Sequence, residues 1–111
     1  LPLALQPRTP GARVREALEV DLVVVLLLPA GSRVATIEAL SSTGTASLKP
    51  GDLWPADRGV VGRALRTRVR QLVADAPGDP DYVSIQPGLR SQLALPVRIG
   101  SELMGVVNVE H

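Results

Sequence analysis

Residues 90–110 read RSQLALPVRIGSELMGVVNVE, and this stretch decides the fold class. In its first half, every second position is apolar: Leu93, Leu95, Val97 and Ile99. Side chains of a strand alternate between two faces, so the spacing predicts a strand with all four on one face. A two-residue turn, Gly100-Ser101, then leads into a nearly continuous apolar run over 103–109. The stretch therefore predicts a buried antiparallel hairpin whose second strand is covered on both faces.

The composition is that of one globular domain. The chain has 111 residues, of which 45% are hydrophobic and 21% charged. Its formal net charge of +1 creates no field that would attract nucleic acid, so no nucleic-acid partner is expected. The longest apolar run, 22–28, is far shorter than the roughly 20 residues needed to span a bilayer. We therefore expect a single domain that makes no membrane contact through this segment.

Both ends of the chain predict an excerpt of a longer protein. Residues 1–9 contain two prolines without a usable period, which is typical of a linker. The chain begins without an initiator Met or the charged start of a signal peptide. It ends at His111 directly after an apolar strand, with no terminal helix. We interpret 1–111 as one domain that is cut from a longer protein at both ends, as expected for an excerpt.

Two short amphipathic helices are expected. Thr9 can cap a helix over 10–20, whose apolar positions recur at helical spacing. Asp57 can cap a second helix over 58–66. Two glycines in this second helix are three residues apart and allow it to approach a neighbouring element closely.

Strands and two long loops fill the rest of the chain. Besides the hairpin, apolar or alternating runs predict three strands: a central one over 21–28, its partner over 33–42, and a charged edge strand over 69–75. Proline and glycine break up two segments, 41–57 and 76–89, which predicts long irregular loops, the second with one helical turn near 81–85. Loops of this length in a small domain are usually functional.

Five segments in this order resemble the GAF domain, a sensory module of bacterial and eukaryotic signalling proteins. They are Asp21 before an apolar strand, RGVVGRAL at 58–65, VAD at 73–75 followed by DPDY at 79–82, RSQLALPV at 90–97, and GVVNVE at 105–110. The resemblance extends from about residue 13 to residue 110.

The resemblance implies an α+β, GAF-like and PAS-related fold. Its central antiparallel sheet has five or six strands in the order 2-1-5-4-3, with helices on one face and loops with a short helix on the other. Where a family member has a ligand pocket, it lies between the loops and the sheet. The family also implies a terminal helix that pairs with the first helix and often with a second subunit. By this resemblance the C-terminal helix is missing here, because the chain ends at His111 before it.

Five residues are candidates for a ligand site at the loops. Trp54 and Tyr82 are the only aromatic residues, and each offers a ring for stacking, although each could equally fill the core beneath its own loop. Arg90 and Ser91 open the fourth strand and could bind a polar or anionic ligand, or could simply lie at the surface. Asp75 could accept a hydrogen bond from a ligand, or shape the turn of its Asp-Ala-Pro-Gly segment.

The composition argues against catalysis and against a cofactor. Cysteine is absent and His111 is the only histidine, so neither a metal site nor a Ser-His pair is expected. Some GAF proteins reduce free methionine sulfoxide through cysteines or attach a bilin to cysteine, and both need a thiol that this chain lacks. No haem is expected either. The arginines of 63–70 scatter over several faces and are expected to be solvated.

The leading hypothesis is a cytoplasmic, bacterial GAF-type sensory domain without enzymatic activity. An unidentified small-molecule ligand would shift the equilibrium of a homodimer and pass the signal to a linked output domain. That domain would be a histidine kinase of a two-component system, a cyclic-dinucleotide enzyme or a transcription regulator. The alternative is a GAF module without a pocket that serves dimerisation or protein–protein interaction.

Overall fold

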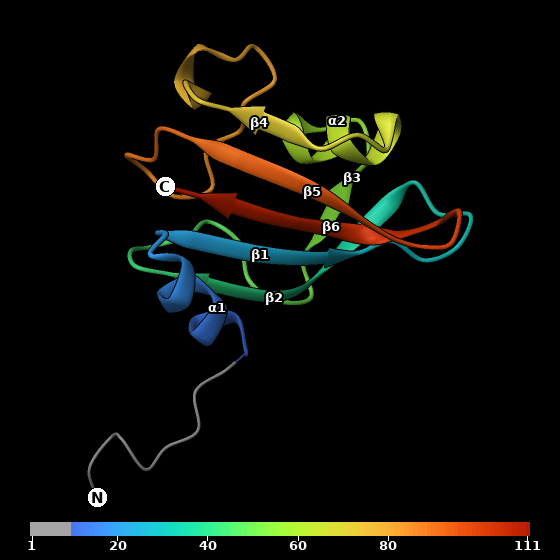
Figure 1. The fold of residues 1–111 in the computed structure, drawn as a ribbon, viewed down its shortest axis with the longest axis horizontal. Helices are drawn as coiled ribbons and strands as arrows, with labels where there is room; N and C mark the ends of the chain where they lie inside the picture. The colour runs from blue at the N-terminus through green and yellow to red at the C-terminus, as the bar shows by residue number, and fades with distance from the viewer. Residues whose placement is uncertain (1–9) are drawn as a thin grey trace, which may run out of the picture.

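A computed structural model describes residues 10–111, which form a six-stranded antiparallel sheet with helices on both faces (Figure 1). The expected linker over 1–9 and the Thr9 cap lie outside the described residues. The elements in chain order are α1 (Pro10–Leu18), β1 (Leu22–Leu27), β2 (Val34–Ser42), β3 (Leu53–Pro55), α2 (Gly59–Thr67), β4 (Gln71–Val73), a 3₁₀ helix (Ala76–Gly78), β5 (Gln92–Ile99) and β6 (Glu102–Glu110). No helix among residues 10–111 is long and apolar enough to cross a membrane.

The strand order is β3-β2-β1-β6-β5-β4. The α+β class expected from the sequence is confirmed, and the order differs by one added strand, β3, on the outer edge of β2. The prediction of an irregular loop over 41–57 was therefore wrong at 53–55. Trp54 pairs there with the buried Ala35, which gives backbone groups of β2 a hydrogen-bonding partner. Three residues ending in a proline are too few to show a strand period.

The main core lies between the sheet and α2. Side chains from β1 and the apolar side of α2 form it: Leu22, Val24, Leu26, Val60, Val61, Ala64 and Leu65. The second helix comes very close to the end of β3, because a Cβ added to Gly62 would lie 2.7 Å from the carbonyl oxygen of Ala56. The helix begins after Arg58, whose side chain makes no capping hydrogen bond, so the prediction of Asp57 as the cap was wrong.

A β-bulge changes the faces of β2. Val25 pairs with Ala39 while the next residue, Leu26, pairs with Ile37, so Glu38 has no partner in β1. Because of the bulge, Ile37 and Leu40 both face the core although they are three positions apart, whereas strict alternation would put them on opposite faces. The single helical turn of the second loop also moves, from the expected 81–85 to Ala76–Gly78.

The C-terminal hairpin is confirmed, but its apolar stripe is not buried in the core. Strands β5 and β6 pair in antiparallel fashion, and Gly100 adopts a φ of 61° in the turn. On the face of β5 opposite the core, Val97 is 42% and Ile99 is 70% exposed. The core side of the strand contains Ala94 instead, which is fully buried. The period of two correctly predicted which side chains share a face, but it did not predict whether that face is buried or exposed.

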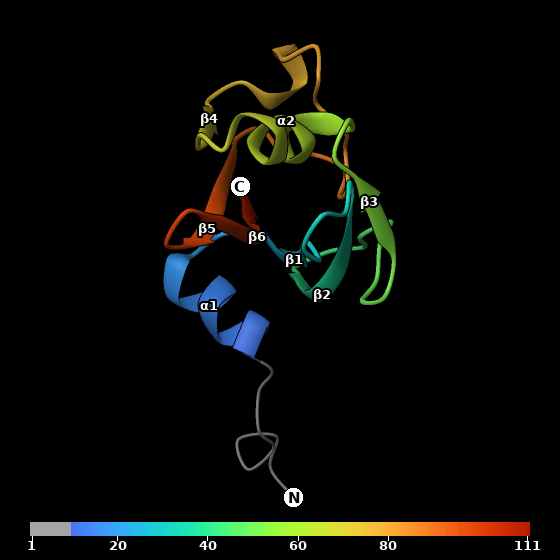
Figure 2. The same cartoon turned by 90° about the vertical axis from the view of Figure 1, so that its right-hand side faces the viewer.

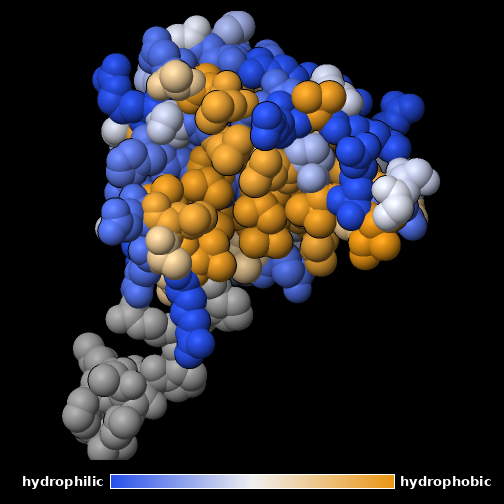
Figure 3. Space-filling model, in the orientation of Figure 1, coloured by the Kyte–Doolittle hydropathy of each residue, from blue (hydrophilic) through white to orange (hydrophobic). Residues whose placement is uncertain are grey.

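The first helix covers only part of its own face of the sheet. Figure 2 shows α1 and α2 on opposite sides, and α1 packs on β1 and β2. Beside α1, an apolar surface crosses β1, β6, β5 and β4 (Figure 3). We call it the open apolar face, and its half-buried or exposed residues are Val25, Leu27, Leu72, Leu93, Leu95, Val97, Ile99, Val107 and Val109.

Candidate functional site

Three polar side chains are buried where β5 starts and β6 ends. The loop over 76–91, which leads into β5, lies over this edge of the core. Glu110 is 1%, Asn108 0% and Gln92 4% exposed. Asn108 and Glu110 are two positions apart in β6, and Gln92 pairs with Glu110 across the strands, so all three share the core face. This polar patch lies on an otherwise apolar face, which makes it the candidate site.

The buried side chains form a hydrogen-bonded chain that ends at a carboxylate. Gln92 Nε2 donates to Asn108 Oδ1 at 2.7 Å, and Asn108 Nδ2 donates to Glu110 Oε2 at 3.0 Å. The Tyr82 hydroxyl, from the loop, donates to Glu110 Oε1 at 3.0 Å. Gln92 Oε1 is buried and has no hydrogen-bond partner among the described residues. A buried acceptor without a partner is costly, so the site favours a donor from outside the chain.

Burial shifts the pKa values of this chain. Removal from water raises the pKa of Glu110 above its usual 4.5, and the hydrogen bonds from Asn108 and Tyr82 oppose that shift. The pKa of Tyr82 is also raised, first by burial and then by the neighbouring Glu110 charge. Glu110 is therefore a carboxyl group that takes up a proton more readily than an exposed glutamate.

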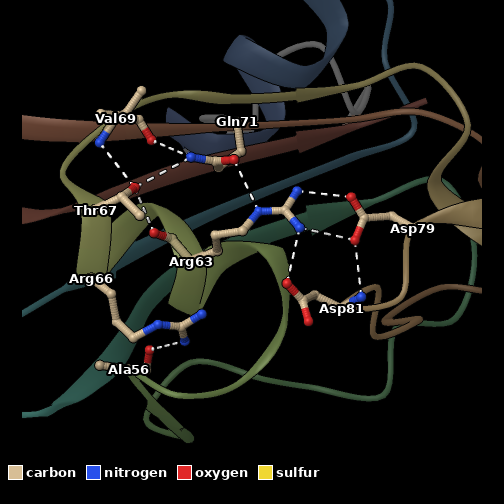
Figure 4. Close-up of polar contacts among 8 residues, drawn as sticks. All are labelled: Ala56, Arg63, Arg66, Thr67, Val69, Gln71, Asp79 and Asp81. Carbon is tan, nitrogen blue, oxygen red and sulfur yellow. Dashed lines mark hydrogen bonds and ion pairs between the residues drawn. The ribbon is translucent and has the colours of Figure 1, made fainter.

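Arg63 of α2 holds the loop on one side (Figure 4). Its guanidinium donates to both carboxylate oxygens of Asp79 at 3.0 and 2.8 Å, and to Asp81 at 2.9 Å. Its Nε donates to the side chain of Gln71 at 2.9 Å. The hydrogen bond from Arg63 lowers the pKa of Asp79 below the usual range. These contacts form a clamp between α2 and the start of the loop.

Gln86 holds the loop on the other side. It is buried, its Oε1 accepts from the Ser42 hydroxyl, and its Nε2 donates to Thr43 Oγ1 at 3.2 Å. Ser42 is the last residue of β2, so this contact ties the loop to the far half of the sheet. Between Arg63 and Gln86, Tyr82 connects the loop to Glu110. The loop is thus a closed cover over the polar chain.

The two aromatic residues of the expected site take different positions. Trp54 is 2% exposed and belongs to the core, where its Nε1 donates to the carbonyl of Arg58 at 2.9 Å. The Arg58 guanidinium lies 4.6 Å from the centre of the ring. Tyr82 is half-buried and reaches Glu110. Trp54 therefore occupies a core position, whereas Tyr82 joins the candidate site.

The other expected site residues lie around the end of β6. The backbone N–H groups of Arg90 and Ser91 both donate to the carbonyl of His111, at 2.9 and 3.0 Å, and the Arg90 residue is exposed. Ser91 Oγ donates to the same carbonyl at 3.3 Å. Asp75 is exposed and precedes the 3₁₀ helix without a side-chain capping bond. Ser91 thus directly precedes Gln92 of the polar chain, whereas Asp75 forms no part of that chain.

Sequence reasoning missed Gln92, Asn108 and Glu110. The apolar run over 103–109 suggested a strand covered on both faces. Asn108 lies within this run and Glu110 follows two positions later, so the two share one face. Polar residues at period two within an apolar strand are the signal that would have found them. Among residues 10–111, no three His, Cys, Asp or Glu residues gather as they would to hold a metal ion.

Comparison with known proteins identifies the family. Residues 12–111 match the family model of the GAF domain, and the chain belongs to this family. GAF domains are in general sensory or regulatory modules of signalling proteins. A search among curated proteins finds no match.

Solved structures share the fold at low sequence identity. The GAF domain of a phosphoenolpyruvate-protein phosphotransferase from Coxiella burnetii has a TM-score of 0.78 and 21% identity over 91% of this chain and 62% of its own. A free methionine-R-sulfoxide reductase from Neisseria meningitidis, in complex with its substrate, has a TM-score of 0.75 and 22% identity over 90% and 57%. The second GAF domain of DevS from Mycobacterium smegmatis has a TM-score of 0.66 and 19% identity over 89% and 66%. The chain thus spans 57% to 66% of these three structures.

Proposed function

We propose that this GAF domain senses a small molecule that binds between the loop over 76–91 and the polar chain of β5 and β6. The observation that carries the proposal is the buried acceptor set, in which Glu110 pairs across the strands with Gln92, whose Oε1 has no hydrogen-bond partner among the described residues. A ligand with N–H or ammonium donors would satisfy both acceptors. Tyr82 and Ser91 would border this ligand. Arg90, Asp75 and Trp54, the other residues proposed from sequence, lie around the same loop or in the core beside α2.

Binding would act through the loop. Entry of a ligand requires the Tyr82–Glu110 and Ser42–Gln86 hydrogen bonds to open, while the Arg63 clamp can keep the loop's first part on α2. A ligand shifts such an equilibrium only if it binds one loop position more tightly than the other. A cytoplasmic output domain joined to this module would read the loop position: a kinase, a cyclic-dinucleotide enzyme or a transcription regulator.

A thermal-shift screen of amines and amino acids tests this proposal. A ligand present at 100 times its Kd stabilises a folded protein by about 2.7 kcal/mol, so a true ligand raises Tm. We expect Glu110→Gln to abolish the rise, because the variant loses the buried charge that would pair with the donor. The matched control is Glu102→Gln, an exposed glutamate of the same strand, which should keep it. Hits that stabilise both variants equally would contradict the proposed site.

A second candidate function is a GAF module that acts as an interaction surface. Two observations favour it: the open apolar face is incompletely covered by α1, and Trp54 fills the core instead of lining a cavity. In this case a second copy of the chain would cover the open apolar face as a homodimer. The loop over 76–91 would then remain closed.

We propose that the domain has no catalytic role, although two similar structures are described as free methionine-R-sulfoxide reductases. Reduction through cysteine thiols has no nucleophile in a chain without cysteine. Measurable consumption of free methionine-R-sulfoxide by the purified chain would contradict this proposal.

A further inference from the structure

A hollow lies at the other end of the sheet from Glu110. It has a volume of about 550 Å³ and opens between the C-terminal half of α2, the end of β3, the β1–β2 connection and the start of β6. Figure 2 looks onto this end of the sheet. Leu28, beside the first hairpin turn, hydrogen-bonds to Met104 of β6, whereas Glu110 pairs with Leu22 at the opposite end of β1. The volume falls within the roughly 300–1,000 Å³ of small-molecule sites.

The floor of this hollow is apolar. Leu65 of α2 and Leu103 of β6 line it and are 5% and 7% exposed, and the half-buried Leu28 packs against the same core. Val34, at the start of β2, adds a side chain that is 38% exposed. An apolar group that entered the hollow would remove part of this surface from water.

The walls are positively charged. Three arginines line the hollow, Arg33, Arg66 and Arg68, against a single acidic residue, Asp57. Arg66 Nη1 donates to the carbonyl of Ala56 at 2.8 Å, and Arg68 Nη1 donates to the carbonyl of Ser101 at 3.2 Å. Within residues 10–111, none of the three arginines forms an ion pair with a carboxylate.

Arg63, on the same helix, is an arginine whose charge is neutralised by carboxylates, and it serves as a comparison. One turn before Arg66, it is bound by two carboxylates, those of Asp79 and Asp81. A guanidinium has five donors, so Arg66 and Arg68 each keep donors beyond their one bond to a carbonyl. The hollow therefore combines arginine charge that no carboxylate of residues 10–111 neutralises with an apolar floor. These free guanidinium donors are not used to hold the loop over 76–91 or the core.

The backbone of Arg68 supports a functional reading of this residue. Arg68 ends α2 in the left-handed conformation, with a φ of 58°, a position at which glycine is strongly preferred. Holding a bulky side chain there costs stability, and such costs concentrate at sites where the side chain is used.

We propose that this hollow binds a small organic anion in which one carboxylate is attached to an apolar body. The carboxylate pairs with the guanidinium groups of Arg33, Arg66 and Arg68, whose planar forks match its two oxygens. The apolar body lies on Leu28, Leu65 and Leu103. This site is separate from the ligand site proposed beneath the loop and does not depend on it.

Isothermal titration of the whole chain with octanoate tests the proposal, with octylammonium, 1-octanol and inorganic phosphate as comparison ligands. We expect saturable binding of octanoate, and at least tenfold weaker binding of the other three. Arg33→Gln combined with Arg68→Gly should weaken octanoate binding at least tenfold, while Tm stays unchanged or rises because glycine relieves the left-handed position. The matched control is Arg13→Gln, which removes the charge of an exposed arginine in α1.

Several outcomes would overturn the site. Equal affinity for octanoate and 1-octanol would show that charge plays no part, and equal affinity for phosphate would show that the apolar floor plays none. Wild-type affinity in the double variant would place octanoate elsewhere, for example on the open apolar face. If Arg68→Gly impaired folding, Arg33→Gln with Arg66→Gln would decide in the same way. Loss of octanoate binding in Glu110→Gln would assign the ligand to the loop site and overturn this one.

Discussion

Glu110 is a buried carboxyl group at the end of a central strand. A carboxylate in such a position is tolerated only if it is hydrogen-bonded or protonated, and here Tyr82 and Asn108 supply two donors. The donors of Gln92 and Asn108 are both directed along the chain toward Glu110, which leaves Gln92 Oε1 without a donor of its own. The orientation of two amides thus follows from one carboxylate.

Replacing Glu110 by Gln should change how stability depends on pH. Because the pKa of Glu110 is raised, the folded chain binds this proton more tightly than the unfolded chain does. The stabilisation from Glu110 is therefore fully present below its unfolded value near 4.5, and is lost as the pH rises through the folded pKa. We expect the free energy of unfolding of the wild type, relative to Glu110→Gln, to fall over this window in urea titrations. Glu102→Gln should show no such trend, and a difference independent of pH would contradict the assignment.

The loop over 76–91 is held by side-chain contacts and a few isolated backbone hydrogen bonds, such as that from Ser47 N–H to the carbonyl of Ile85, instead of by pairing in the sheet. Its 3₁₀ helix is only three residues long, and its side chains are fixed by Arg63 of α2, Glu110 of β6 and the Ser42–Thr43 pair at the end of β2. Elements of this kind open locally at lower free energy than core strands do. The clamp made by Arg63 is therefore the contact that sets how easily the first part of this loop opens.

Replacing Arg63 by Lys should loosen the first part of the loop. A lysine keeps the charge but cannot bind both oxygens of Asp79 at once, so we expect a loss of about 1 kcal/mol in the free energy of unfolding and faster amide exchange over 79–85. The lowered pKa of Asp79 means that its stabilisation is present above its usual value of 3.8 and is lost as the pH falls through the folded value. The difference between variant and wild type should therefore shrink in acid. Arg66→Lys on the same helix is the control, and faster exchange there as well would contradict a role specific to the clamp.

At the scale of the whole molecule, the two faces of the sheet are unequal. The face toward α2 is covered by core side chains and the loops apart from the hollow at the end of α2, whereas the face toward α1 leaves an apolar surface exposed (Figure 3). Exposed apolar patches of this kind commonly mark interaction sites. The open apolar face is the feature that connects this domain to the second candidate function.

Replacing Leu72 by Lys tests that connection. Leu72 lies in the edge strand β4 within the open apolar face and is 77% exposed, so the change should alter the stability of the monomer by no more than about 0.5 kcal/mol. If the face joins two copies, sedimentation velocity over a concentration series should show weaker self-association in the variant, because a buried lysine would lack a partner. Leu53→Lys, at the opposite edge of the sheet, is the control. A wild type that stays monomeric at every concentration would contradict the dimer.

The sequence by itself determined the periodic elements and the resemblance to the GAF family, and that resemblance implied the order of the strands that carry a clear period. Alternation and helical spacing are local properties, so β1, β5, β6 and α2 could be predicted within a few residues. The short edge strand β3 and the bulge at Glu38 could not be predicted, because pairing with a distant strand creates them.

Only the tertiary structure decided which faces are buried and where the polar groups meet. The stripe from Leu93 to Ile99 shares one face as predicted, but that face stays partly open because α1 packs on β1 and β2. In the same way, Tyr82 was a candidate from its loop, yet its partner Glu110 is 28 residues away and was found only through the register of the sheet. Burial is a relation between segments far apart in the chain, and a local pattern contains no information about which segment will provide the cover.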